Sequence, residues 1–527
     1  MSLVVSGSKT QSRPILLAAV IAAISIVGLA CTGGSDDDVA DATNLPEDGS
    51  EASEAGDASA APNESTEPGV LDITSEPDPS TLAGLEAAWA DNRAAVVRRL
   101  QEGEFGATDS TLTGPGDFVV DLNRCPAGWN DRASAGGAIE IVHILSESDV
   151  GAYAVGAQAY FDHVNSEGGV DGRLINYEVV DDDLIPTKTI EAVDDRVDGT
   201  AIGITTFGTT TSQSVFDLLN QACIPQPFVG SAHPAWGDPR SHPWTVGLQL
   251  SYASEAILWG NWMKRNLTGQ LPVKVGALTI DNDYGRAYQV SFERWVASNP
   301  GVVSEIVAVG HDPSAVDVSA EIAEIEAANP DVFLVLTAGA ACESAIKAGE
   351  TSRINEITVA RFLPTACNDP ERFLIPSDRA GDDYLTVDGG VKALDDPTNE
   401  EDPFIGFIAE LLAEVEPVVE PEQLSMAGAG AGQFAWAYVE ALRIAAELDG
   451  GINRATLLLA LRSLELRHPM VVAGITFGTD GADDAYPIEG ARMMRYSAGQ
   501  QAWEPESLVV DLNRATPNCS WDGTDCS

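Results

Sequence analysis

The sequence predicts an α/β protein with two lobes, each a parallel β-sheet wound with helices on both faces. Two observations carry this prediction. Short apolar runs rich in β-branched residues alternate along the chain with longer stretches of helical character, which is typical of doubly wound parallel sheets. The chain also has 527 residues, about twice the length that one such sheet requires, so we expect two lobes.

The alternating elements occupy the middle of the chain. The predicted strands are residues 138–145, 174–182, 201–208, 273–281 and 331–339. The predicted helices are residues 152–166, 187–197, 212–222, 284–298 and 316–328.

The first 31 residues have the character of an export signal. Lys9 and Arg13 are followed by an apolar run, residues 15–30, which is shorter than the about 20 residues of a membrane span and is typical of a secretory signal. The run ends in Gly28-Leu29-Ala30-Cys31, which resembles the lipoprotein box of bacteria. We therefore expect residues 1–31 to be a lipoprotein signal peptide, with Cys31 lipidated and the protein anchored to the cell membrane on its outer side. Secretion with an unmodified Cys31 is the alternative.

Residues 32–80 carry 14 acidic residues and no Lys or Arg, which predicts a disordered acidic tether. Over the whole chain, 81 acidic residues face 29 basic ones, and the formal net charge is −52. Such a charge does not attract nucleic acid or anionic lipid head groups. The lipid anchor is therefore the only membrane contact that we expect.

Two features flank the alternating elements. After Ser80, a candidate helix cap, residues 82–100 carry an apolar stripe near helical spacing, with a basic patch on its flank. We favour a helix packed on the protein's own core; a partner-binding helix is the alternative. The hexapeptide Val-Val-Asp-Leu-Asn-Arg occurs at 119–124 and again at 509–514, each time followed by a Cys and a Trp. We expect these copies to be edge strands near the ends of the domain.

Residues 161–183 lead from a helix into a strand. Gly168 and Gly169 end the helix, because glycine tolerates the left-handed conformation found there, and Gly172 permits a tight entry into the strand. The strand leaves Asp181–Asp183 at the carboxyl edge of the sheet, where ligands sit in open α/β proteins. These acids are the functional candidates of the segment, with capping and loop hydrogen bonds as the alternative.

Several motifs in this region resemble one family. Asn165, Gly168-Gly169-Val170 and Gly172-Arg173, followed by an Asp pair, resemble the leucine/isoleucine/valine-binding type of periplasmic substrate-binding protein. Further segments are similar to those of the family and occur in its order: 208–232, 281–295 with an Asp-x-x-Tyr-Gly motif, 330–350 and 474–481. The resemblance covers about residues 136–500.

The resemblance implies the type I periplasmic-binding fold, in which two lobes joined by about three hinge crossings close on a small ligand. It implies delivery of that ligand to the permease and ATPase subunits of an ABC transporter, by a monomer without a cofactor. The expected division is 81–135 for the N-terminal helix and first flank, 136–248 for lobe 1, 249–385 for lobe 2, 386–475 for the return to lobe 1, 476–500 for the return to lobe 2, and 501–527 for the C-terminal flank.

The expected ligand contacts lie in loops that follow strands of both lobes. Hydroxyls and free N–H groups at the start of the helix after residue 208 could bind a carboxylate, with ordinary helix capping as the alternative. Tyr284 matches an aromatic residue that packs on the ligand in the family. The full set of candidates is Ser146, Ser148, Asp149, Thr209, Thr210, Thr211, Ser231, Ala232, His233, Tyr284, Gly339, Ala340, Thr365 and Ala366.

The sequence departs from the family at the acid that pairs with an amino acid's ammonium group. Family members place this acid in the segment matching 364–369, where this chain has Thr365 and Ala366, with Asp369 offset by a few residues. Burying an ammonium without a partner is unfavourable. We therefore expect a ligand with a carboxylate or other acceptor at one end and an uncharged remainder. An amino acid, an amide and a small organic acid all stay open.

Cysteine usage agrees with export, because six cysteines remain when Cys31 is set aside, and an even number suits an oxidising compartment. In the implied topology Cys342 and Cys367 each follow a lobe-2 strand, so we expect them to form a disulfide. The weaker expectations are the pairs Cys125–Cys223 and Cys519–Cys526.

We do not expect an enzyme. The chain has no Gly-rich phosphate loop and no Gly-x-Ser-x-Gly elbow. Its six histidines show no metal-ligand spacing, so we expect no metal site. The alternative to transport is a ligand-sensing receptor lipoprotein of the same fold that signals through a partner.

Overall fold

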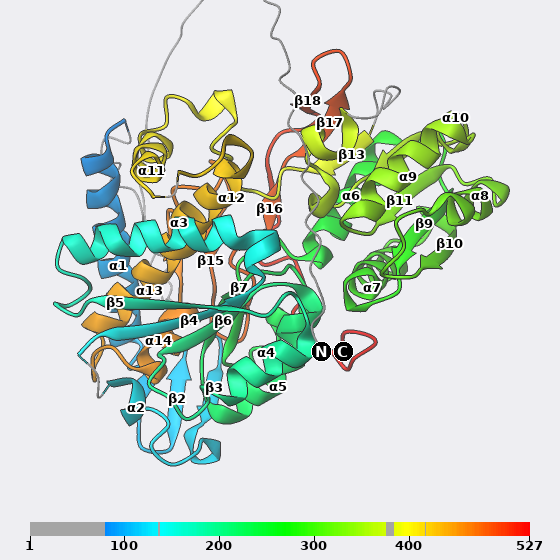
Figure 1. Ribbon diagram of the computed structural model, residues 1–527. Helices are drawn as coiled ribbons and strands as arrows, with labels where there is room; N and C mark the ends of the chain where they lie inside the picture. Colours follow the sequence, from blue (N-terminus) through cyan, green and yellow to red (C-terminus); the bar gives the residue numbers. More distant parts are fainter. Residues whose placement is uncertain (1–79, 135–136, 376–383, 417) are drawn as a thin grey trace, which may run out of the picture. The chain divides into compact units, whose positions relative to one another are not determined.

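The computed structural model describes residues 80–134, 137–375, 384–416 and 418–527 (Figure 1). The expected signal peptide, the lipidation site Cys31 and nearly all of the acidic tether lie outside the described residues. None of the described helices combines the length and the apolar character that a membrane crossing requires.

The first described helix, α1 (Leu82–Glu102), begins after Thr81, whose side chain caps it, and not after the predicted cap Ser80. Trp89 of this helix packs edge-on against Trp436, with ring centroids 5.3 Å apart. The basic flank forms two ion pairs, Arg93–Glu440 and Arg99–Glu465. The favoured interpretation, a helix packed on the protein's own core, is confirmed.

The lobe-1 sheet consists of parallel strands in the order β5 (Ile175–Asp181), β4 (Ile139–Leu145), β6 (Gly203–Thr206), β7 (Gln226–Val229) and β8 (Thr245–Gly247). A single bridge between Phe207 and Gly230 joins β6 to β7. The connecting helices are α3 (Glu147–Ser166), α4 (Pro186–Asp194) and α5 (Thr209–Ala222).

Alternate residues of β4 point to opposite faces of this sheet, as in any strand. Val142 and Ile144 pack with α4 and α5. Ile141 and Leu145 belong to the core on the α3 face. Figure 1 shows α3 on one side of the sheet and α4 and α5 on the other. The predicted doubly wound α/β arrangement is confirmed.

The turn between α3 and β5 has the left-handed backbone conformation that its glycines predict. Gly168 and Gly169 both have positive φ, and a Cβ on Gly169 would lie 2.0 Å from the Arg173 carbonyl oxygen. Asn165 fastens the helix end to the strand by bonding both the N–H and the C=O of Ile175. These glycines therefore serve the backbone.

The acids after β5 are used in local hydrogen bonds. Asp181 accepts from the Glu147 and Asp183 amides, and Asp182 accepts from the Thr189 hydroxyl at 2.7 Å. Asp183 pairs with Lys188. The capping alternative accounts for this cluster.

Within the described residues, the lobe-2 sheet has seven strands. In spatial order they are β10 (Val303–His311), β9 (Val273–Ile280), β11 (Val332–Leu336), β12 (Ala360–Phe362), β13 (Tyr384–Val387), β17 (Met493–Ser497) and β18 (Ala502–Pro505). The first five are parallel, whereas β17 runs antiparallel to both β13 and β18. The expected C-terminal flank, 501–527, thus begins inside this sheet.

Helices also cover both faces of the lobe-2 sheet. Residues of α6 (Tyr252–Asn266) and α7 (Asp283–Ser298) pack on one face. Residues of α8 (Ser319–Ala327) and α9 (Ala340–Thr351) pack on the other, and the short helix α10 (Ile354–Ile357) precedes β12.

After β13 the chain returns to lobe 1. The returning helices are α11 (Pro403–Ala413), α12 (Leu424–Gly428), a π-helical segment (Ala429–Ala435), α13 (Trp436–Glu447) and α14 (Arg454–Leu461). The ring centroid of Phe434 lies 4.9 Å from that of His143, which is buried in β4. β14 (Glu465–Leu466) and β15 (Phe477–Gly478) then pair before the chain enters β17.

The two copies of the repeated hexapeptide lie in separate sheets. The first copy overlaps β3 (Phe118–Asp121), the edge of an antiparallel sheet with β2 (Thr111–Gly114) and β1 (Gly106–Ala107). The second contains β19 (Val510–Asp511), which pairs with β16 (Gly490–Ala491). Both copies are edge strands, as expected, but they do not pair with each other. The short helix α2 (Asp131–Ser134) lies between β3 and β4.

The structure contains the three expected disulfides. They are Cys125–Cys223, Cys342–Cys367 and Cys519–Cys526, with Cα–Cα distances of 5.5, 5.6 and 4.8 Å.

Candidate ligand-binding site

Three buried hydroxyl groups meet where the loops after β6 and β7 reach helix α6. Thr209 Oγ1 lies 2.9 Å from Ser231 Oγ and 3.1 Å from the Tyr252 hydroxyl. The loops come together because β6 and β7 are neighbouring parallel strands, whose carboxyl ends share one edge of the sheet. We call Thr209, Ser231 and Tyr252 the hydroxyl cluster. It joins lobe 1 to lobe 2, since Tyr252 is the first residue of α6.

The other hydroxyls of the same loop serve the backbone and the core. Thr211 Oγ1 donates to the Phe207 carbonyl at 2.5 Å, and Ser212 Oγ accepts from Thr206 Oγ1 at 2.7 Å. Thr210 is half-buried. Of the threonines predicted here, only Thr209 belongs to the hydroxyl cluster.

Aromatic rings pack beside the hydroxyl cluster. Tyr252 stacks on Tyr288 with ring centroids 4.0 Å apart, and Tyr284 lies edge-on to Tyr252 at 5.1 Å. Tyr284 and Tyr288 share one face of α7 because they are four residues apart. Burial raises the pKa of Tyr252 to about 12, so its hydroxyl is neutral and can donate to a ligand. The predicted Tyr284 is thus placed beside the cluster.

Glu255 is an ionisable residue of this region that the sequence analysis missed. It lies in the first turn of α6 and is completely buried. Its Oε1 accepts hydrogen bonds from the Tyr288 hydroxyl at 2.9 Å and from Thr365 Oγ1 at 2.8 Å. Burial raises the Glu255 pKa from 4.5 to about 7. Through Glu255, the predicted Thr365 is connected to the tyrosines.

A signal for Glu255 was present in the sequence. Tyr252, Ala256, Trp259 and Met263 recur at helical spacing, and Glu255 interrupts this apolar stripe. An acid in the first turn of a helix is ordinarily explained by the helix dipole. Its burial depends on α7 and on the segment around Thr365, both distant in sequence.

Three predicted residues of the first βα loop form a group of their own. Ser146 Oγ donates to Asp149 Oδ2 at 2.6 Å, and Ser148 Oγ donates to the same atom at 3.2 Å. Among the described residues, none of these side chains hydrogen-bonds to the hydroxyl cluster.

The predicted residues near α9 and Thr365 contribute backbone positions or lie at the surface. Gly339 precedes α9 with φ of 64°, and Ala340 and Ala366 are exposed. Asp369 is exposed and caps the next turn by accepting from the Arg372 amide at 3.1 Å. The offset acid therefore has a local role.

The loop after β7 packs against the C-terminal end of the chain. Ala232 accepts a backbone hydrogen bond from the Tyr252 amide at 2.8 Å. His233 is buried, accepts from the Ala235 amide at 3.0 Å, and meets the Trp521 ring edge-on at 4.7 Å. Burial lowers the His233 pKa to about 3, so the ring is neutral. His233 thus supports this loop.

The disulfide-closed segment 519–526, which we call the C-terminal loop, contacts both lobes. On lobe 1 the Cys519 amide donates to the Gly237 carbonyl at 2.9 Å. On lobe 2, Arg286 of α7 donates to the Thr524 carbonyl at 3.2 Å. Figure 1 shows the C terminus close to α7. Since Arg286 follows Tyr284 by two residues, the loop reaches the helix that carries this candidate ligand contact.

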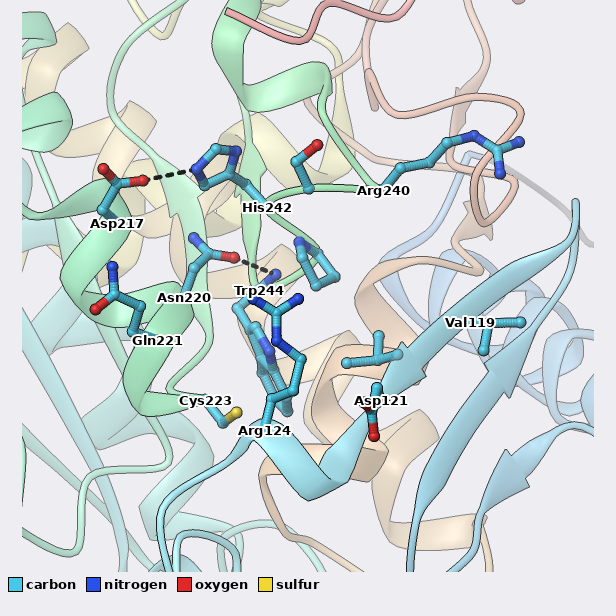
Figure 2. A pocket seen from close by; sticks show the side chains of 13 residues that line it. Val119, Asp121, Arg124, Asp217, Asn220, Gln221, Cys223, Arg240, His242 and Trp244 are labelled. Carbon is cyan, nitrogen blue, oxygen red and sulfur yellow. Dashed lines mark hydrogen bonds and ion pairs between the residues drawn. The ribbon is translucent and has the colours of Figure 1, made fainter. Parts of the chain in front are cut away.

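Two surface pockets lie away from the hydroxyl cluster. Figure 2 shows the first, of about 660 Å³, where Arg124 of the first repeat copy points toward Trp244. Burial opposes charge on His242 there, but hydrogen bonds to Asp238 and Asp217 raise its pKa overall. The second, of about 870 Å³, lies between α3 and residues 411–423.

Comparison with known proteins adds to this geometry. Residues 147–501 match the family model described as "Periplasmic binding protein". A comparison with curated protein sequences finds no match.

Several solved structures share the fold. A fatty acid ABC transporter substrate-binding protein from Thermomonospora curvata is 15% identical, with a TM-score of 0.60 over 72% of this chain and 95% of that chain. A branched chain amino acid ABC transporter from Thermus thermophilus, solved with bound valine, is 17% identical, with a TM-score of 0.60 over 72% and 97% of the two chains. A solute binding protein from R. palustris, in complex with benzoate, is 18% identical, with a TM-score of 0.54 over 74% and 99%.

Proposed function

The chain belongs to the periplasmic binding protein family, and from this premise we propose that it captures a small ligand between its two lobes and delivers it to an ABC importer. The hydroxyl cluster is the observation that carries the proposal. Hinged two-lobe proteins close when one ligand contacts both lobes, because such a ligand binds the closed state more tightly. Thr209 and Ser231 belong to lobe 1 and Tyr252 to lobe 2, so a ligand at this cluster would contact both.

The chemistry of the cluster favours a ligand that carries a carboxylate or another hydrogen-bond acceptor. Three neutral hydroxyls can each donate one hydrogen bond, and hydrogen bonds to a charged acceptor are stronger than neutral ones. The rings of Tyr284 and Tyr288 offer apolar surface to the rest of the ligand. The fold relatives support this class, since valine, benzoate and fatty acids all carry a carboxylate.

Binding and release without a chemical step is the activity that we propose, carried out by a monomer. We also propose that lipidated Cys31 holds the protein on the outer side of the cell membrane. The apolar run before Cys31 and the acidic residues after it support this location. An anchored protein with a long polar tether could reach a permease in the same membrane.

A thermal-shift screen of the purified full chain tests the proposal. The panel contains amino acids, amides, short-chain acids and aromatic acids. A true ligand at about 100 times its Kd stabilises the folded state by about 2.7 kcal/mol, so the melting temperature should rise with ligand concentration. If no compound of the panel raises it, the proposed function fails.

Uptake measurements separate import from sensing. Cells that lack the protein should lose uptake of the compound found in the screen. Unchanged uptake together with a lost cellular response to the compound would instead favour the receptor alternative.

A further inference from the structure

Glu255 is a buried carboxyl group that the proposed acceptor-binding site leaves unexplained. It is completely buried on α6, in a helix face that otherwise carries Tyr252, Ala256 and Trp259. Acidic side chains are almost never fully buried unless they are paired. The buried carboxyl group of Glu255 therefore needs a partner.

The hydrogen bonds of Glu255 satisfy only one of its two oxygens. Oε1 accepts from both Tyr288 and Thr365. Oε2 is equally buried and has no hydrogen-bond partner among the described residues. Buried polar atoms nearly always have a partner, and one without it calls for an explanation such as a bound ligand.

The surroundings of Glu255 suit a positive charge. Within the described parts of the chain, no Lys, Arg or His forms an ion pair with it. The Tyr288 hydroxyl donates to it, and the rings of Tyr252 and Tyr284, whose hydroxyls burial keeps neutral, pack against Tyr288. None of these groups carries a positive charge that could compensate the carboxylate. Burial also raises the Glu255 pKa, as expected for a carboxyl group that lacks a cationic partner.

The hydroxyl cluster and Glu255 are connected by one stack of rings. Tyr252 has its hydroxyl at the cluster, and its ring lies on that of Tyr288, whose own hydroxyl donates to Glu255. Donors for an acceptor thus lie at the hydroxyl of Tyr252, and a carboxylate acceptor lies at the hydroxyl of Tyr288.

We propose that Glu255 is the specificity-determining residue of the ligand site: its unpartnered oxygen accepts hydrogen bonds from a positively charged nitrogen of a small zwitterion whose carboxylate binds the hydroxyl cluster. This inference rests on the proposed function. The sequence predicted a ligand whose remainder is uncharged, and this inference replaces that expectation, because α6 supplies the acid that is missing at Thr365 and Ala366.

Matched ligand pairs test the inference on the purified full chain. Isothermal titration calorimetry compares each standard amino acid with the carboxylic acid that lacks its amino group, for example valine with 3-methylbutanoate. At least one amino acid should bind at least about 100-fold more tightly than its matched acid, since removing one partner of a buried charge pair strongly weakens the complex.

Two variants show whether Glu255 causes the preference. Glu255→Gln keeps the shape and removes the charge, so affinity for the amino acid should fall about 100-fold while affinity for the matched acid stays within about threefold. Thr365→Val is the control, because it removes one hydrogen bond to Oε1 and keeps the charge. This control should retain the preference for the amino acid.

The outcomes are distinguishable. A nitrogen-free acid that binds as tightly as its amino acid overturns the role of Glu255 and leaves the proposed function standing. An equal loss for both ligands in Glu255→Gln overturns it too, because Glu255 would then be structural. If no compound of either set binds while another compound of the thermal-shift panel does, the role of Glu255 is overturned and the proposed function stands. If Glu255→Gln does not fold, the affinities of the unmodified chain for each amino acid and its matched acid decide whether the site prefers a zwitterion.

Discussion

The hydroxyl groups of the site are already paired with one another before any ligand arrives. Thr209 Oγ1 stands between Ser231 and Tyr252, within 3.1 Å of both. A ligand acceptor can exchange places with one of these contacts, so that each hydroxyl stays satisfied. This arrangement makes Thr209 the residue on which the cluster depends.

Thr209→Val should therefore weaken ligand binding by about 1 to 3 kcal/mol, because buried polar groups are left unpaired. Calorimetry with the ligand found by the screen measures this loss. Thr210→Val is the matched control, since Thr210 is half-buried and makes no side-chain hydrogen bond within the described residues. Equal losses in the two variants would show that the cluster does not bind the ligand.

Glu255 should also make the stability of the ligand-free protein depend on pH. Its folded pKa of about 7 lies above the ordinary value of 4.5. Between these values the folded state holds more protons than the unfolded state, so stability falls as pH rises. The tyrosines that face Glu255 stay neutral in this window, because burial raises their pKa values.

Chemical denaturation at about pH 5 and about pH 8 measures this effect. From about pH 5 to about pH 8, the unmodified chain should lose up to about 3 kcal/mol of its free energy of unfolding relative to Glu255→Gln. Asp484 also has a pKa raised to about 7, but it is common to both proteins and cancels in the comparison. A stability difference that does not change with pH would contradict the raised Glu255 pKa.

Sequence reasoning identified about half of the site at this scale. Thr209 and Ser231 were predicted because they follow strands, whereas Tyr284 and Thr365 were predicted from the family resemblance; the structure brings all four to one region. Tyr252 and Glu255 were missed because they start a helix. The acid in the apolar stripe of this helix was the one local signal, and it does not show that the first turn faces the site.

Among the elements, the C-terminal loop lies beyond the residues that match the family model. The family match ends at residue 501, and the loop follows it. Its disulfide joins cysteines seven positions apart. Cys519 contacts lobe 1, and Thr524 contacts α7 of lobe 2. The loop therefore adds a link between the lobes beyond the hinge crossings.

Opening this disulfide by Cys519→Ser/Cys526→Ser should lower the free energy of unfolding by about 2.5 kcal/mol from chain entropy. It should also raise deuterium uptake in the first turn of α7, which loses its restrained partner. The double variant Cys125→Ser/Cys223→Ser serves as control, because that disulfide lies in lobe 1 and its flank and does not close the C-terminal loop. If uptake in α7 does not differ from the unmodified chain, the loop is not a link between the lobes.

Element prediction succeeded where strands are buried on both faces. β4, β6, β9 and β11 are continuous apolar runs and were all predicted. β10 (Val303–His311) was missed because it is the edge of its sheet and its residues are partly exposed. β12 and β13 are too short for their pattern to be distinguished from loops.

In the whole molecule, the proposed function combines a ligand-binding body with a membrane anchor. The formal net charge of −52 keeps the protein from binding anionic membrane surfaces by itself. The proposed membrane attachment must then depend on the lipid at Cys31. Cys31→Ser should release the protein into the medium or the soluble fraction, as cell fractionation and immunoblotting would show. If the variant stays in the membrane fraction to the same extent, lipidation of Cys31 is not the anchor.

A crystal structure of the protein with the tightest ligand from the screen would show whether a small ligand lies between the hydroxyl cluster and Glu255. We expect ligand density with an acceptor group within hydrogen-bond distance of Thr209 Oγ1 and the Tyr252 hydroxyl, and a nitrogen at Glu255 Oε2. Ligand density in the pocket beside Arg124 (Figure 2), with Thr209 and Tyr252 still bonded to each other, would contradict this expectation.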